Sequence, residues 1–506
     1  MNRTQVLIVG AGPTGLVLAL WLTHQGVAVR IVDQASGPGT TSRALAVHAR
    51  TLELYRQMHL DAPIVERGYT VPGARLWLGG EQKARVPFNE LVSDLTPYGF
   101  LHIFPQDEHE RLLLERLTTL GVHVEYRTEL LSFTEVNGHV AATLRGPDGV
   151  DFSQDADFIA GCDGARSKVR ERMGTGFPGG TYAQIFYVAD VEGDGSAFNG
   201  DLNVEFDESD FLAIFPLAHK DRIRLIGAIR PAEGSAPETL TFDDIKDRAV
   251  SYLKLKVGKV NWFSTYRVHH RVTDSFRKGR AFLLGDAAHI HTPVGGQGMN
   301  TGIGDAINLA WKLKAVLAGL ANEQLLNTYE PERRAFALRL VKTTDKAFKF
   351  AAAQGPVAEI VRTRLAPLVL PQIVKFESVR EYIFRVLSQI TLNYRDGGLG
   401  EGHAGSVHGG ERLPWVRFDK SDNYAALEDM TWQIHVYGDA TPTLREWCHN
   451  QNVPLHCYAW RAAFDGVGLV KDALYFLRPD TYIGLASAEQ DTSIVARYLA
   501  KHSIKP

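Results

Sequence analysis

Apolar residues fall in short runs that glycines, prolines and charged residues interrupt, which is typical of an α/β protein. Residues 5–9 (QVLIV) and 27–32 (VAVRIV) are two such runs, each of strand length. Between them, Leu16, Leu20 and Leu22 recur at a spacing that favours a helix. The pattern predicts a strand, a helix and a second strand, which form one βαβ unit.

Further along the chain, apolar strands are predicted at residues 157–161 and 281–284. An amphipathic helix follows the second strand, because apolar residues recur along one helical face: Ile303, Ile307, Ala310, Leu313 and Leu317. Residues 176–270 differ, because turn signals such as 192–195 (EGDG) separate strand-like runs at 183–191, 202–206, 211–216 and 222–229. This region therefore predicts a β-rich unit.

The turn after the first strand reads Gly10-Ala11-Gly12-Pro13-Thr14-Gly15, and the second strand ends at Asp33. In a dinucleotide-binding βαβ unit, Gly10 permits the tight turn, Gly12 lets the backbone approach a pyrophosphate, and Gly15 lets the helix pack on the strand. The helix N-terminus attracts phosphate, and Asp33 can accept hydrogen bonds from a ribose diol. The turn predicts a dinucleotide site without separating FAD from NAD.

Two later segments resemble phosphate or polyol sites. Asp163-Gly164 ends one predicted strand, and Gly285-Asp286 ends the next, before a glycine-rich stretch at residues 295–300. Asp286 suits a polyol hydroxyl, and N–H groups near Gly298 could stabilise negative charge on a reduced ring. The alternative is two structural turns, in which aspartates cap helices and glycines supply positive φ angles.

Composition narrows the class of protein. A chain of 506 residues is too long for one ordinary core, so several domains are expected. Its residues are 45% hydrophobic and 22% charged, and the net charge of −3 gives no reason to expect a nucleic-acid partner. Three cysteines without a C-x-x-C pair argue against a disulfide framework, and we expect no metal site. No apolar stretch is long enough for a membrane span and no signal peptide is recognised, so a cytoplasmic location is expected.

The three glycine and aspartate segments together resemble the single-component FAD-dependent aromatic hydroxylases, the para-hydroxybenzoate hydroxylase and phenol hydroxylase superfamily. Shorter matches support the resemblance across roughly residues 1–345: Ser42–Ala44, Arg50–Glu53, Gln106, Glu110 and Leu113, Trp311–Leu313 and Tyr329–Arg333. After this region, Gly410, Arg412 and Pro414 resemble the start of the thioredoxin-like tail of the phenol hydroxylase branch.

The resemblance implies an α/β fold with three parts. A discontinuous Rossmann-type, GR2-like FAD-binding domain is expected at residues 1–71, 101–175 and 271–345, with an inserted mixed-sheet substrate domain at 72–100 and 176–270. A helical segment (346–396) and a glycine-rich linker (397–414) would lead to a thioredoxin-like domain (415–506) without C-x-x-C. A homodimer is compatible with this arrangement.

The resemblance also implies a set of residues around FAD. Asp33 would hold the adenosine ribose, although glutamate is more usual there; Arg43 and Gln106 would contact the diphosphate and ribityl region, with Asp286. Asp163, Gly164 and Arg166 are associated with FAD and NAD(P)H. The remaining expected contacts are Gly10, Gly12, Pro13, Thr14, Gly15 and Gln34 for the dinucleotide, and Pro293, Gly295, Gly298, Met299 and Asn300 for the isoalloxazine.

The reaction that the resemblance implies is hydroxylation of a phenolic or polycyclic aromatic compound by O2 and NADH or NADPH, through a flavin C4a-hydroperoxide. A base near the substrate hydroxyl would assist it, and the candidates are His102, Tyr187, His219 and His289. Phe186, Phe211 and Phe215 could line the substrate pocket with Pro293 and Gly295. The alternatives are an epoxidase or halogenase on the same fold, or a flavin-bound protein without catalytic activity.

Overall fold

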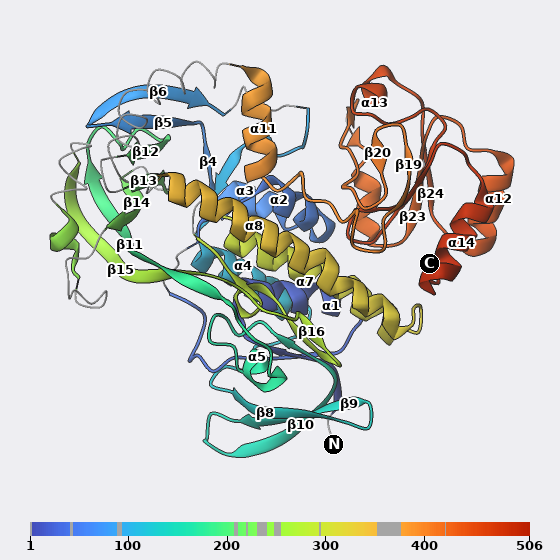
Figure 1. Ribbon diagram of the computed structural model, residues 1–506, viewed down its shortest axis with the longest axis horizontal. Helices are drawn as coiled ribbons and strands as arrows, with labels where there is room; N and C mark the ends of the chain where they lie inside the picture. Colours follow the sequence, from blue (N-terminus) through green and yellow to red (C-terminus); the bar gives the residue numbers. More distant parts are fainter. Residues whose placement is uncertain are drawn as a thin grey trace.

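The computed structural model describes residues 3–40, 44–88, 94–206, 211–218, 221–229, 240–246, 255–292, 295–351, 376–419 and 421–506. Within these ranges, the side chains of residues 206, 211, 344–351 and 377 are not described. Two large sheets and a separate C-terminal sheet surround the central helices α7 and α8 (Figure 1).

The first large sheet has seven strands, and its centre is parallel. Its strands are β16 (Arg277–Lys278), β17 (Ala281–Leu283), β10 (Asp151–Gly161), β1 (Arg3–Val9) and β2 (Val29–Val32), with β9 (His139–Arg145) and β8 (Glu129–Val136) extending from β10. Helices α1 (Pro13–His24) and α7 (Gly298–Leu317) pack against each other beside it. Val6, Leu7 and Ile8 are fully buried, because both faces of a parallel sheet are covered.

The second large sheet is antiparallel apart from the parallel pair β5–β12. In order it comprises β18 (His289–Ile290), β15 (Lys256–Val272), β11 (Gly179–Asp194), β14 (Arg222–Ile229), β13 (Phe211–Pro216), β12 (Leu202–Phe206), β5 (Gly73–Leu78) and β6 (Glu81–Pro87). A small sheet of β3 (Ala46–Val47), β7 (Leu101–Ile103) and β4 (Tyr69–Val71) packs against one of its faces. That face carries Val188, whereas Tyr187 and Ala189 join a separate core on the other face.

The third sheet lies near the C-terminus and has six strands (Figure 1). They are β20 (Val407–His408), β19 (Glu401–Ala404), β26 (Ile483–Ser487), β25 (Leu474–Leu477), β23 (Gln433–Tyr437) and β24 (Leu455–Tyr458), and we call residues 399–506 the C-terminal unit. Residues 397–414, which were expected to be a glycine-rich linker, include β19 and β20 of this sheet. Gly402 and Gly409 let backbones pack closely, because added Cβ atoms would lie 2.2 Å from the carbonyl oxygen of Ala486 and the nitrogen of Glu401.

The remaining elements connect these sheets. They are α2 (Ala49–Tyr55), η1 (Arg56–Met58), α3 (Asp61–Arg67), α4 (Gln106–Thr119), α5 (Lys168–Met173), η3 (Gly285–Ala287), η4 (Glu323–Thr328), α8 (Tyr329–Ala351), α11 (Glu377–Leu387), β21 (Arg417–Phe418), β22 (Ser421–Asp422), η6 (Ala425–Asp429), α12 (Pro442–Gln451), α13 (Ala462–Gly466) and α14 (Thr492–His502). Within the described ranges, no helix combines the length and apolar character needed to cross a membrane.

Candidate active site

The glycines of the first turn occupy positions that either exclude a side chain or face open space. Gly10 has a φ angle of 103°, and an added Cβ would lie 2.3 Å from the carbonyl oxygen of Cys162. At Gly15 an added Cβ would lie 2.0 Å from the carbonyl oxygen of Gly10. At Gly12, the residue before α1, an added Cβ meets no atom within 4 Å. The N-terminus of α1 therefore presents bare backbone to an open surface.

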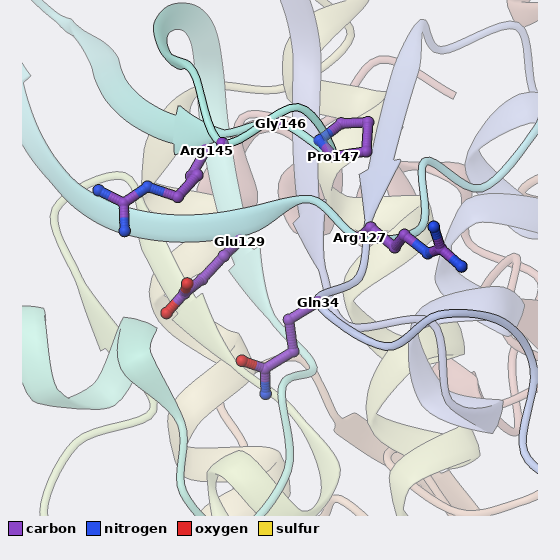
Figure 2. A pocket seen from close by; sticks show the side chains of 7 residues that line it. Gln34, Arg127, Glu129, Arg145, Gly146 and Pro147 are labelled. Atoms are coloured by element: carbon purple, nitrogen blue, oxygen red, sulfur yellow. The ribbon is translucent and has the colours of Figure 1, made fainter.

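Asp33 follows β2 and closes the same turn from the other side. Its carboxylate accepts hydrogen bonds from the backbone N–H groups of Ala11 (2.7 Å) and Ala35 (2.8 Å). A hollow of about 370 Å³ begins at the next residue, Gln34, and its other lining residues are Arg127, Glu129, Arg145, Gly146, Pro147 and Gly149 (Figure 2). The carboxylate thus lies between the first turn and a surface hollow.

The second turn packs on the first through the side chain of Thr14. Added Cβ atoms at Gly285 and Gly302 would lie 2.7 and 2.3 Å from the Thr14 hydroxyl oxygen. Gly285 has a φ angle of 57° and donates its N–H to the Asp305 carboxylate over 2.9 Å. Asp286, next in the chain, is exposed. One compact junction therefore joins the two turns and α7, with Asp286 at its surface.

Two glycines and Asn300 shape the loop that leads into the N-terminus of α7. Gly295 and Gly296 have φ angles of 83° and 62°. The buried Asn300 amide donates to the carbonyl oxygens of Ala46 (2.9 Å) and Gly296 (3.0 Å), and its oxygen accepts the N–H of His48 (2.9 Å). The side chain of Asn300 consequently fixes the loop against β3.

The first residues of α7 remain accessible. Gly298 and Met299 are partly exposed, Gln297 supplies no side-chain cap, and the first turn contains no acidic residue. Such a helix end attracts an electron-rich group. Pro293, which was expected to line the same site, lies outside the described residues.

In the Asp163–Gly164 turn the aspartate side chain caps a helix and the glycine supplies a positive φ angle. The Asp163 carboxylate accepts hydrogen bonds from the Ser167 hydroxyl (2.6 Å) and from the N–H groups of Lys168 (2.7 Å) and Val169 (3.1 Å). Burial raises its pKa above the ordinary value of 3.8. Gly164 supplies a φ angle of 72°. The side chain of Asp163 therefore caps α5, which leaves its backbone as the part that could approach a ligand.

Gln106 and Arg43 are the two polar residues expected near the diphosphate, and of these the structure describes Gln106. Gln106, at the start of α4, donates its amide N–H to the Glu110 carboxylate over 2.8 Å. Glu110 in turn accepts the backbone N–H of Gly39 over 3.3 Å. Gln106 is thus oriented by its own helix, and Arg43 lies outside the described residues.

The candidate bases do not gather at one site. His102 is fully buried, with ring nitrogens 2.9 Å from the carbonyl oxygen of Ile64 and 3.3 Å from the hydroxyl of Thr70. His289 lies 2.7 Å from the Asp305 carboxylate and stacks on Phe276. Both histidine side chains are buried and bonded within the protein, and their assignment as bases stays a prediction.

Tyr187 lies on the sheet face that points away from the small sheet, because adjacent residues of a strand face opposite ways. Its ring covers Gly227 of β14, where an added Cβ would lie 2.3 Å from the Tyr187 hydroxyl oxygen. His219 lies outside the described residues. Phe186 and Phe215 belong to the opposite face, with Tyr266 and Trp262 as neighbours on β15. The side chain of Phe211 is not described.

Residues 3–344 match a family model described as an FAD binding domain, which covers more than half of the chain. The chain belongs to the FAD-dependent aromatic hydroxylases. A 6-methylpretetramide 4-monooxygenase of Streptomyces rimosus is 36% identical over 460 residues, which are 86% of this chain and 79% of the relative. A flavin-dependent monooxygenase of Mycobacteroides abscessus is 30% identical over 514 residues, 98% and 99% of the two chains.

Solved structures of similar proteins extend the likeness over the whole hydroxylase. An anhydrotetracycline hydroxylase from Streptomyces rimosus has a TM-score of 0.79 at 26% identity and covers 100% of both chains. An aklavinone-11 hydroxylase, solved with FAD and aklavinone, has a TM-score of 0.80 at 25% identity and the same coverage. The hydroxylase is a monooxygenase that binds FAD.

The geometry fits the cofactor and adds residues that the motifs did not reveal. Two uncapped helix ends, α1 and α7, and the open surface at Gly12 suit a long molecule with phosphates at one end and a flat ring at the other. Asp305, which supports the Gly285 turn from behind and is itself held by Arg333, was not among the expected site residues. Its sequence signal was weak: it lies seven residues before Lys312, on the same face of α7.

Proposed function

We propose that the hydroxylase adds one oxygen atom from O2 to a phenolic ring of a polycyclic aromatic compound, with electrons from NADH or NADPH. Three relatives or structural neighbours are named for polycyclic compounds of this kind, 6-methylpretetramide, anhydrotetracycline and aklavinone. The main structural support is the aromatic face of the eight-stranded sheet, where Phe215, Trp262 and Tyr266 remain partly exposed. Flat apolar side chains suit a flat apolar substrate.

The residues divide the work of holding FAD. We assign the diphosphate to the turns at Gly10–Gly15 and Gly285–Asp286, the ribose to Asp33, and the isoalloxazine to the N-terminus of α7. The hollow beside Gln34 fits the adenine end by its position next to Asp33. When bound, FAD supplies the electron transfer and the activation of oxygen. The N–H groups of α7 would stabilise negative charge on its ring.

NAD(P)H would dock near α5. Arg170 donates to the carbonyl oxygens of Ala287 (2.9 Å) and Ala165 (2.7 Å), with Arg166 exposed nearby in sequence. Guanidinium groups attract phosphates, because they are permanently charged and donate several hydrogen bonds. For the C-terminal unit we propose a thioredoxin-like fold, supported by parallel β23–β24 with α12 between them and the antiparallel hairpin β25–β26 followed by α14. A homodimer and a cytoplasmic location remain predictions.

The test combines purified FAD-loaded protein, NADH or NADPH, O2 and phenols of one to four rings. Substrate-accelerated oxidation of NAD(P)H, with a product that gains one oxygen atom by mass spectrometry, would support the proposal. If no compound accelerates oxidation and no product gains oxygen, the proposal fails. Phe215→Leu should raise KM or change the hydroxylated position, whereas the matched Tyr187→Phe, on the opposite sheet face, should change neither.

A further inference from the structure

Several short motifs that match the family, but to which no contact with FAD is assigned, meet at one buried junction. This junction lies where α2, α7 and α8 touch the C-terminal unit (Figure 1). Its charged members are Arg50, Glu53, Asp305, Lys312, Glu332, Arg333, Arg412, Arg478 and Asp480. We call this set the junction network.

The centre of the junction network is the pair Glu332 and Arg478. Two nitrogens of Arg478 lie 2.7 and 3.0 Å from the Glu332 carboxylate, and both side chains are fully buried. Lys312 donates to the same carboxylate over 2.7 Å. Arg478 also donates to Asp480, which accepts the indole N–H of Trp311 over 3.0 Å. The centre thus joins α7 and α8 to the loop before β26.

A second arm of the junction network reaches the flavin turn. Arg333, next to Glu332 on α8, donates to Asp305 over 2.6 Å and to the hydroxyl of Tyr394 over 2.7 Å. Asp305 accepts the backbone N–H of Gly285, which precedes Asp286. The ring of Tyr394 lies 5.2 Å from the Arg478 guanidinium carbon. One chain of contacts therefore runs from the C-terminal unit to the second turn.

A third arm links α2 to the same loop. Arg412 donates to the Glu53 carboxylate over 2.8 Å, and Arg50 donates to the hydroxyl of Thr481 over 2.6 Å. Thr481 is buried and has a φ angle of 71°. A β-branched residue adopts this conformation only where its surroundings impose it. The loop 479–481 is therefore held in one shape by the elements that carry the flavin turns.

Buried charges of this kind behave as a unit. In a dry interior each charge depends on its partners, so the loss of one leaves another unpaired and forces neighbouring elements to move. An attachment between two domains does not need such an arrangement, because apolar packing would serve as well. Because Asp305 accepts the N–H of Gly285, a movement within the network would reach the second turn.

We propose that the C-terminal unit is a working part of the flavin site: through Arg478, Arg333 and Asp305 it holds the Gly285–Asp286 turn in the orientation that binds FAD. Arg478 and Arg333 act as positioning residues. This inference rests on the proposed assignment of FAD to the Gly285–Asp286 turn, and it stands or falls independently of the substrate and of NAD(P)H.

The test compares two full-length variants that each remove an arginine contact to the C-terminal unit. Arg478→Met breaks the junction network. Arg56→Met is the matched control, because Arg56 pairs with Asp422 (2.7 Å) and Glu428 (3.0 Å) of the same unit but has no link to α7. Measurements are the Kd for FAD, the visible spectrum of the bound flavin, its reduction potential, and Tm.

We expect Arg478→Met to raise the Kd for FAD at least about tenfold and to alter the spectrum and the potential. Arg56→Met should lower Tm and leave Kd, spectrum and potential as in the wild type. Equal effects of both variants on FAD, or unchanged FAD binding in Arg478→Met, would overturn the proposal.

A second pair of variants with smaller changes keeps the proposal testable if Arg478→Met does not fold. Tyr394→Phe removes only the hydroxyl that Arg333 contacts, and should raise the Kd for FAD about threefold with a shifted flavin spectrum. Tyr482→Phe is its control, because the Tyr482 ring packs against Tyr394 at a tilt of 42° and its hydroxyl has no hydrogen bond within the part of the chain described. Equal FAD affinity and spectra in these two variants would also overturn the proposal.

Discussion

Two turns that each pair an aspartate with a glycine place their carboxylates differently in this protein. Asp163-Gly164 and Gly285-Asp286 each follow a buried parallel strand and precede a helix. The Asp163 carboxylate turns inward and caps α5, whereas Asp286 is exposed beside a turn that Asp305 supports from behind. An aspartate at a strand end can therefore serve the protein's own backbone, as Asp163 does for the N–H groups of Lys168 and Val169.

Asp286→Ala is the change with the largest expected effect on the cofactor. We expect the Kd for FAD to rise about 10- to 100-fold, because a hydrogen bond to a charged group would be lost. The variant should keep the wild-type circular dichroism spectrum, since the side chain is exposed. Glu115→Ala, an exposed acid on α4, is the control and should retain FAD. Wild-type flavin content in Asp286→Ala would contradict the assignment.

Gly285→Ala and Gly164→Ala separate the two turns by their surroundings. Both residues have left-handed φ angles, so both variants share a backbone strain of about 1–2 kcal/mol. Only at position 285 would the new methyl group meet an obstacle, the Thr14 hydroxyl at 2.7 Å. Gly285→Ala should therefore lose FAD affinity severalfold more than Gly164→Ala. If the two turns were equivalent, equilibrium titration with FAD would show equal losses of affinity in the two variants.

Asp163→Ala should act on stability and not on the cofactor. Loss of the cap on α5 is expected to cost about 1–2 kcal/mol in the free energy of unfolding. FAD content, measured by absorbance after desalting, should stay near that of the wild type. A variant that is stable but free of FAD would show that the carboxylate serves the ligand after all.

The smallest expected effect is a pH dependence of the stability that Asp163 contributes. Burial raises its folded pKa above 3.8, so the folded protein holds this proton to a higher pH than the unfolded chain. The stability contributed by Asp163 should therefore fall as pH rises from about 3.8 through the folded pKa. The comparison is the free energy of unfolding of wild type against Asp163→Asn across this range. A difference that is constant with pH would argue against the burial.

The sequence predicted the flavin half of the fold well because its signals are local. The apolar run at residues 5–9 and Gly15 each constrain their immediate neighbours, and β1 and α1 form as expected. The positions of Phe186 and Tyr187 were also predictable, since adjacent residues of a strand face opposite ways. Grouping both at one pocket overlooked that alternation.

Other features depend on partners that are distant in sequence. The pattern around Asp163 does not reveal that Ser167 and two backbone N–H groups will use its carboxylate. The sequence around His289 does not reveal that α7 will place Asp305 against its ring. The glycines near position 402 suggest a flexible linker, although they allow two backbones to pack. Each of these outcomes follows from long-range packing.

The order of strands in the first sheet has a consequence for synthesis of the protein. β1 is hydrogen-bonded to β10, and β10 is hydrogen-bonded to β17, which ends at Leu283. At roughly 5–20 residues per second, translation needs about 14 to 55 seconds to pass from the first strand to that residue. In the later part of this time β10 has been made and β9 can pair with its residues 151–156, but residues 159–161 still lack β17. The growing chain therefore depends on protection of this short apolar edge from aggregation before its cofactor can bind.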